Sequence, residues 1–211
     1  MTEAEIKEKL DGMKKTRKKL QTLTTIVSLA SIALLIAYNF LGVTFMQVST
    51  KDTIISAANF TEGFTFPGWQ MVFWGCGGQF IYQDNLIDPN PWAIVGMVGT
   101  ILVLIICTAT YKAGKNMTKA VKEFISGAFL CYSACVLSFF IVPLAMMFVT
   151  SGGVYNFASY VYDDGTLFIP TNLCVALGVV LAVFAVVKFY NGAFLLKQKA
   201  FAKKYAPKKN K

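Results

Sequence analysis

The chain has 211 residues, of which 55% are hydrophobic and 15% are charged, and its mean hydropathy is +0.55. With Gly counted and Tyr omitted, the apolar share is about 58%, against about 45–50% in soluble domains. This composition excludes a disordered chain and argues against an ordinary soluble enzyme. The length excludes a large transporter, because about 20 apolar residues per span plus loops leave room for about four crossings.

Long stretches without charge mark the candidate membrane spans, because a charged side chain at the bilayer centre costs about 2.5–3.5 kcal/mol. The sequence has five such stretches, and four of them are dominated by aliphatic residues and Phe over a span's length. The third of these four is long enough to tilt or to emerge from the bilayer, with Pro143 as the expected kink. The four stretches predict transmembrane helices at about residues 20–43, 91–111, 124–150 and 169–189.

The fifth stretch, Gly63 to Gln83, contains Pro67 and several glycines and glutamines. Such a segment breaks a helix and leaves backbone groups unpaired, which a lipid environment does not tolerate. With four spans, 19 of the 20 Lys and Arg residues fall on one side, which carries a net charge of +14 against −5 on the other. A fifth crossing would divide the basic segments between the two sides. The positive-inside rule therefore predicts four spans, with both termini in the cytoplasm.

Residues 1–20 form a basic leader. It opens with a capping-box pattern, Thr2 and Glu5, and its acidic and basic residues recur at helical spacing, as in Asp11 and Lys15. The leader therefore predicts a separate amphipathic helix that lies on the inner leaflet. A cleaved signal peptide is the alternative for the first span, but the long apolar core and the four acidic residues of the leader favour a signal anchor.

The other end of the chain is also basic, and residues 191–211 predict a polybasic cytoplasmic tail. Both ends are expected to act as topology determinants and interface anchors. The sharper hypothesis is that they bind anionic lipid head groups of the inner leaflet, or an acidic partner. Nucleic acid is not an expected partner, because no groove-reading motif is present. The residues assigned to lipid head groups are Lys14, Lys15, Arg17, Lys18, Lys19, Lys203 and Lys204.

The spans between these ends lack the residues that catalysis or ion transfer requires. The chain has no His, and we find no acidic or basic residue between the span ends. No nucleophile set, paired carboxylates within a span or phosphate-binding glycine motif is visible either. We therefore expect no catalytic residues, no metal site and no cofactor.

Small residues recur every four positions in two of the spans, and such rows let membrane helices approach closely. We interpret them as the seams of an intramolecular bundle, with contacts between copies of the chain as the alternative. A disulfide between Cys76 and Cys174 is a further hypothesis. The predicted helix-packing residues are Gly127, Cys131, Cys135, Cys174, Gly178 and Ala182.

The first predicted outer loop, residues 44–90, is much longer than a helix hairpin needs, and such loops are usually structured or functional. It carries an aromatic cluster that is too apolar for exposure to water. One interpretation is an interfacial belt that dips into the outer leaflet. The other is a contact surface for a protein partner or a second copy of the chain. The cluster consists of Phe64, Phe66, Trp69, Phe73, Trp74, Phe80 and Tyr82.

The second predicted outer loop, residues 151–168, contains an Asp-Gly pair between two β-prone runs, 159–162 and 166–169, which predicts a hairpin. Residues 43–48 and 79–83 of the first loop supply further candidate strands. Because an isolated hairpin is only marginally stable, we expect the two loops to pair into one small sheet that caps the bundle.

A long first and a shorter second outer loop resemble the layout of the claudin-type tetraspan proteins, in topology only. That family's Trp and paired-Cys motif is not matched, because Trp69, Trp74 and the single Cys76 lie close together. We therefore assign the chain to no family.

The predicted fold is an all-α membrane protein: a four-helix transmembrane bundle over residues 21–190, with both termini cytoplasmic and a small extracellular β-structured cap. The predicted function is non-enzymatic, in a multi-pass protein of the cell membrane whose outer loops bind a partner or assemble laterally. The alternative is a small channel or transport subunit that acts as an oligomer.

Overall fold

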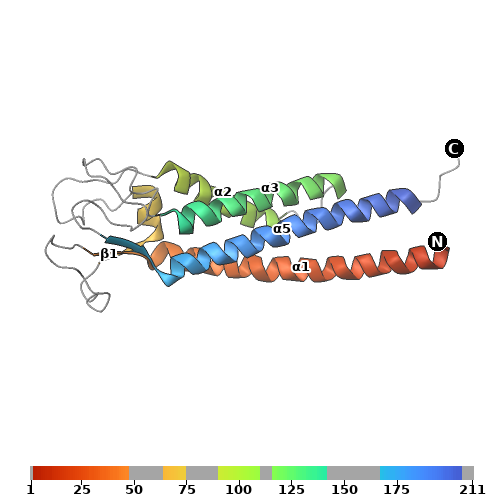
Figure 1. Cartoon of the computed structure of the whole chain (residues 1–211), viewed down its shortest axis with the longest axis horizontal. Coiled ribbons are helices and arrows are strands. Elements are labelled where there is room, and N and C mark those ends of the chain that lie inside the picture. Colours follow the sequence, from red (N-terminus) through yellow and green to blue (C-terminus); the bar gives the residue numbers. More distant parts are fainter. Residues whose placement is uncertain (1, 48–63, 75–89, 110–115, 142–166, 206–211) are drawn as a thin grey trace.

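The structure is a computed structural model that describes residues 2–47, 64–74, 90–109, 116–141 and 167–205. Four helices lie lengthwise beside one another and alternate in direction (Figure 1). The start of α1 and the end of α5 consequently lie at the same end, here called the terminal end. The helices are α1 (Glu3–Phe40), α2 (Pro91–Ala109), α3 (Asn116–Ala134), continued by the π-helix η3 (Cys135–Phe139), and α5 (Asn172–Tyr205).

The membrane character of the chain is clear from these helices. Among the described residues, three helices are long and apolar enough to cross a membrane, namely Ala4–Phe40, Thr118–Phe139 and Asn172–Tyr205, and Pro91–Ile106 is a shorter apolar helix. Large apolar side chains are exposed on all four helices, whereas many buried side chains are Ser or Thr. Large apolar side chains exposed along every helix, together with buried Ser and Thr beside the apolar core, fit helices whose solvent is lipid.

α1 is longer than the predicted first span. It runs without a break from the leader into the apolar segment, so the prediction of a separate leader helix on the inner leaflet was wrong in this respect. No Pro interrupts residues 3–40, and nothing in the sequence ends a helix before Leu41. The capping box is confirmed: Glu5 N–H donates to Thr2 Oγ1 (3.4 Å), and Thr2 N–H donates to Glu5 Oε2 (2.9 Å).

α5 is likewise one helix that includes both the predicted fourth span and the tail as far as Tyr205. Its last turn contains Lys203 and Lys204, whose charges favour the helix C-terminus. Lys9 Nζ of α1 lies 6.0 Å from the centroid of the Phe201 ring of α5. The basic ends of the two helices therefore run along each other, antiparallel, beyond the apolar part of the molecule (Figure 1).

α5 is central to the packing. It contacts α3 most extensively and α1 next, whereas α2 packs mainly on α3 and hardly touches α1. A hydrogen bond joins α1 to α2 near the end opposite the termini, where Asn39 Nδ2 donates to Met97 Sδ at 3.8 Å. The α2–α3 contact is tied by Ser133 Oγ, which donates to the Gly96 carbonyl at 2.9 Å.

The predicted small-residue seams are correct in part. Gly178 is buried so closely against Ser138 that no Cβ fits between them, and Gly127 faces the Phe189 ring. Cys131 and Cys135 are exposed, however, and do not lie in the α3–α5 contact. A four-residue step rotates by about 40° around a helix, so a row that starts in the contact leaves it within two steps.

The other predicted helix-packing residues lie near this contact. Cys174 is a buried free thiol whose Sγ is 3.5 Å from the Leu137 carbonyl oxygen. Ala182 is half-buried at the edge of the core. The proposed disulfide partner of Cys174, Cys76, lies outside the described residues, as does the predicted kink at Pro143.

Three short strands form an antiparallel sheet at the end opposite the termini: β1 (Gly42–Gln47) lies between β2 (Phe64–Pro67) and β3 (Leu167–Pro170). β1 and β3 match the predicted strands at 43–48 and 166–169, whereas β2 was not predicted. The candidate strands at 159–162 and 79–83 lie outside the described residues. These three short strands do not form the whole extracellular cap that was predicted from the two loops. The cap therefore stays a prediction.

The described part of the fifth uncharged stretch is not a membrane-spanning helix. After β2 it forms a short π-helix, η2 (Gln70–Trp74), whose Met71 and Val72 are buried in the core. Gly68 lies so close to the Tyr38 ring that a Cβ would overlap it. The chain then returns to α2 with Asn90, whose N–H donates to the Val72 carbonyl and whose Oδ1 caps the helix.

Candidate functional site: a basic pocket near the terminal end

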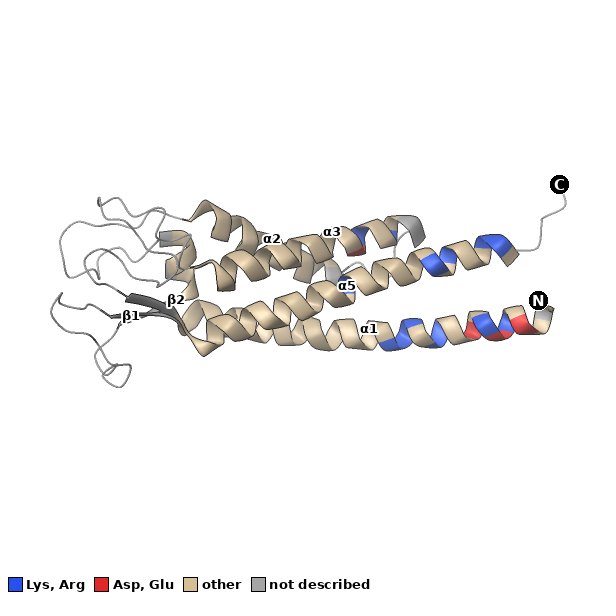
Figure 2. Cartoon of the chain, in the orientation of Figure 1, with Lys and Arg blue, Asp and Glu red and all other residues tan. Residues whose placement is uncertain are grey.

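Charge in the described residues is confined to the terminal end (Figure 2). α1 carries no charged residue beyond Lys19, α3 none beyond Glu123, and α5 none before Lys188. At the exposed start of α1, Lys14 Nζ lies 2.8 Å from Asp11 Oδ1, so Asp11 pairs with Lys14 and not with Lys15 as predicted. The hydrogen bond and charge of Lys14 hold the pKa of Asp11 below its usual value.

A second ion pair lies between α3 and α5. Lys188 Nζ is 3.0 Å from Glu123 Oε2, and the Lys188 side chain is only 4% exposed. This contact is an ion pair without a well-aligned hydrogen bond. Glu123 Oε2 is buried, and within the described part of the chain it accepts no hydrogen bond of good geometry. Lys188 Nζ also lies 5.5 Å from the centroid of the Phe184 ring. The ammonium group therefore has a carboxylate and an aromatic face in place of water.

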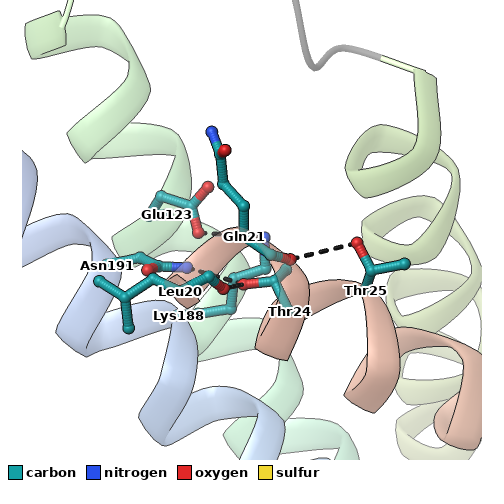
Figure 3. A network of polar contacts seen from close by, with 7 residues as sticks. All are labelled: Leu20, Gln21, Thr24, Thr25, Glu123, Lys188 and Asn191. Atoms are coloured by element: carbon teal, nitrogen blue, oxygen red, sulfur yellow. Dashed lines mark hydrogen bonds and ion pairs between the residues drawn. The ribbon is translucent and has the colours of Figure 1, made fainter. Parts of the chain in front are cut away.

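Neighbouring polar groups align α1 with α5 at this level (Figure 3). Asn191 Nδ2 donates to Thr24 Oγ1 at 2.9 Å, and the Thr24 hydroxyl donates to the Leu20 carbonyl at 2.8 Å. The charge-free part of α1 begins at Leu20, so Thr24 lies about 6 Å inside the apolar segment, at 1.5 Å per residue. Lys188 precedes Asn191 by three residues and therefore lies about 4.5 Å deeper still.

The depth of Lys188 corrects the sequence analysis. An ionisable side chain about 10 Å inside the apolar boundary is costly unless it is paired, and Glu123 supplies the pair. The expectation that no charged residue lies between the span ends was therefore wrong for Lys188, which lies within the predicted span at 169–189. The sequence contained a sign that Lys188 is buried. Lys188 falls on the same helix face as the buried residues Leu181, Ala185, Gly192 and Leu195, at spacings of three and four.

The ion pair lines a pocket of about 100 Å³ between α1, α3 and α5, to which Ile106 of α2 also contributes. Among the described residues, four cations and one carboxylate line it, which gives these side chains a formal net charge of +3. The remaining lining residues are polar or apolar, and Ile106 is 41% exposed. The lining residues are Arg17, Leu20, Gln21, Thr24, Ile106, Lys119, Lys122, Glu123, Ser126, Lys188, Asn191, Phe194 and Leu195.

The pocket includes one of the predicted head-group residues, Arg17. The others on α1, Lys14, Lys15, Lys18 and Lys19, are exposed outside the pocket, as are Lys203 and Lys204 at the end of α5. Sequence reasoning did not single out Lys119, Lys122, Glu123 or Lys188. These residues come from helices that are distant in sequence, and only the packing of α3 on α5 brings them together.

The predicted partner-binding aromatics fall mostly outside what the structure describes. Trp69 and Phe73 are half-buried, and Phe73 packs against the hydrophobic core. The side chains of Phe64, Phe66 and Trp74, and all of Phe80 and Tyr82, are not described. Within the described ranges, no three Cys, Asp or Glu side chains come together as a metal site would require.

Comparison of the chain with protein-family models, with curated proteins and with solved structures gives no match. Its function is therefore inferred from its own residues and geometry.

Proposed function

We propose that the chain is a four-pass protein of the cell membrane, with the terminal end in the cytoplasm and the sheet end outside. The support is the charge distribution: every charged side chain described lies toward one end of the helices (Figure 2). Cytoplasmic loops carry an excess of Lys and Arg, so this end is the cytoplasmic one. The charge-free part of α1, from Leu20 to Phe40, is about 31 Å long and matches the ~30 Å hydrocarbon core.

We further propose a non-enzymatic function in which the outer end binds a protein partner or a second copy of the chain. The observation that carries this proposal is the sheet, because strands from the two predicted outer loops pair through β1. In addition, the segment at 68–73 is packed onto the bundle. The described part of the outer end thus contains a three-stranded sheet, with β2 and β3 as its edge strands. Edge strands and aromatic side chains are both common contact sites.

Purification of the full chain in mild detergent, followed by mass determination, tests this function. We expect a mass above that of one chain, from a second copy or a co-purifying protein. The variant Phe80→Ser with Tyr82→Ser is expected to reduce it to one chain, because both aromatics belong to the predicted contact surface. The matched control removes two aromatics from the terminal end, Phe201 and Tyr205, whose ring centroids lie 4.8 Å apart.

A single chain without a co-purifying protein would contradict the proposal. Equal loss of mass in the aromatic variant and in its control would do so as well. A channel or transport subunit, the alternative function, predicts solute or ion flux in vesicles reconstituted with the purified protein, and the proposed binding function predicts none.

A further inference from the structure

We propose that the basic pocket near the terminal end binds the phosphate group of an anionic phospholipid of the inner leaflet. This inference goes beyond the proposed partner binding, because it concerns the opposite end of the molecule and a different kind of ligand. It also differs from general attraction between a basic tail and a charged leaflet, because it assigns one pocket with defined walls.

The first argument is charge. Arg17, Lys119 and Lys122 enter the pocket from two helices, and Glu123 is its only carboxylate among the residues described. Glu123 is already paired with Lys188 at 3.0 Å. The remaining three cations therefore have no carboxylate partner in the pocket, and an anion there would meet a guanidinium group and two ammonium groups. Arginine and lysine together are the usual ligands of phosphate oxygens in proteins.

The second argument is size and polarity. A cavity of about 100 Å³ accommodates a phosphate-sized group and a few waters. Apolar side chains also line the pocket, with Leu20 on α1, Ile106 on α2 and Leu195 on α5. A ligand with an anionic head and an apolar tail fits such a lining, whereas a fully hydrated anion would leave the apolar side chains unused.

The third argument is position. Arg17 precedes Leu20, the first residue of the apolar segment of α1, by about 4.5 Å along the helix. The Arg17 side of the pocket thus lies at the depth of the inner-leaflet phosphates, and the Lys188 side lies deeper. Among the described residues α1 makes few contacts with α2, and Ile106, which lines the pocket from α2, is 41% exposed.

The Lys188–Glu123 pair has a role in this arrangement. The pair neutralises the deepest cation of the pocket, and the phosphate-binding charge consequently lies toward the cytoplasm, on Arg17, Lys119 and Lys122. A lipid phosphate at that level keeps its acyl chains on the side of Ile106, in the bilayer.

Native mass spectrometry of the full chain tests the site, with dioleoyl phosphatidylglycerol, dioleoyl phosphatidylcholine and inorganic phosphate as probes. We expect phosphatidylglycerol to bind and the triple variant Arg17→Gln, Lys119→Gln, Lys122→Gln to weaken this binding by at least about tenfold. The matched control, Lys7→Gln with Lys197→Gln and Lys199→Gln, removes the same charge from exposed positions of α1 and α5 outside the pocket and should change binding by no more than about twofold.

A charge-conserving variant, Arg17→Lys with Lys119→Arg and Lys122→Arg, keeps the cations and should retain most of the binding, which separates a lost site from a lost fold. If inorganic phosphate competes with the lipid, free phosphate occupies the same site. If inorganic phosphate does not compete, the site takes the lipid alone. Both results support a site for the lipid phosphate. Equal losses in the pocket variant and the control, or equal binding of phosphatidylcholine, would overturn the inference.

Discussion

At the scale of single residues, Lys188 and Lys14 show how burial changes the value of an ion pair. Each lies within 3.0 Å of a carboxylate oxygen, but the Lys188 side chain is 4% exposed and the Lys14 side chain 70% exposed. Water screens the exposed pair and competes with it, whereas the buried ammonium group has few alternatives to Glu123. The buried pair therefore fixes how α3 and α5 align.

We predict that Lys188→Met destabilises the protein by about 2 kcal/mol, because it leaves the Glu123 carboxylate unpaired. This value lies between the cost of removing one partner of an exposed ion pair, about 1 kcal/mol, and that of a buried one, about 3–5 kcal/mol. The double variant Lys188→Met with Glu123→Leu removes both charges and should recover most of this loss. Unfolding in sodium dodecyl sulfate, followed by circular dichroism, measures the differences. As the control, Lys14→Met should cost less than about 0.5 kcal/mol. A double variant as unstable as the single one would count against the pair.

At the scale of elements, the sequence predicted the apolar centres of the helices well but not their ends. Uncharged apolar runs of span length leave few alternatives to a helix in lipid, so the four segments were visible. The continuity of α1 and α5 into the basic ends was missed, because we took the change from apolar to charged residues as a boundary. A helix does not end where its surroundings change from lipid to water. It ends where a Pro or a capping residue interrupts it.

The seams between helices were predictable only in part, and for a related reason. Gly178 and Gly127 lie in helix contacts, but the regular spacing that pointed to them also pointed to Cys131 and Cys135, which face outward. β2 was missed because Pro67 and the glycines after it were interpreted only as helix breakers. The pocket was not predictable, since its cations come from separate helices and gather only when these pack.

We predict that Gly178→Ala destabilises the protein by about 1–3 kcal/mol, because the new methyl group would overlap Ser138 and strain a packed contact. Ser138 Oγ donates to the Cys174 carbonyl at 2.7 Å, so its side chain has no free direction in which to move. Gly12→Ala is the matched control: nothing lies within 4 Å of its Cβ position, and alanine should stabilise the exposed helix by about 0.5–1 kcal/mol. Thermal unfolding in detergent measures both. Similar changes in the two variants would refute the close α3–α5 contact.

At the scale of the whole molecule, the two long helices are longer than a bilayer crossing needs, and their charged residues lie toward the terminal end. α1 has 38 residues and is therefore about 57 Å long, compared with a hydrocarbon core of about 30 Å. α5 has 34 residues and runs beside it to Tyr205. The contact of Lys9 with the Phe201 ring indicates that the basic ends lie side by side as an antiparallel helix pair and are not two separate segments.

The orientation of this pair gives the last prediction. In a variant whose five cysteines are replaced by alanine, a single cysteine at Lys51 should react with a membrane-impermeant maleimide in intact cells, because the first loop lies outside. A single cysteine at Lys208 should react only after the membrane is permeabilised, because the basic end lies inside, where the positive-inside rule retains Lys and Arg. Lys14→Cys controls for the other terminus and should behave like Lys208→Cys, since an even number of spans places both ends on one side. Labelling of position 14 but not of position 208 in intact cells would mean an odd number of spans. Labelling of both positions without position 51 would mean that the bundle is inverted. In either case the pocket would no longer face the anionic inner leaflet.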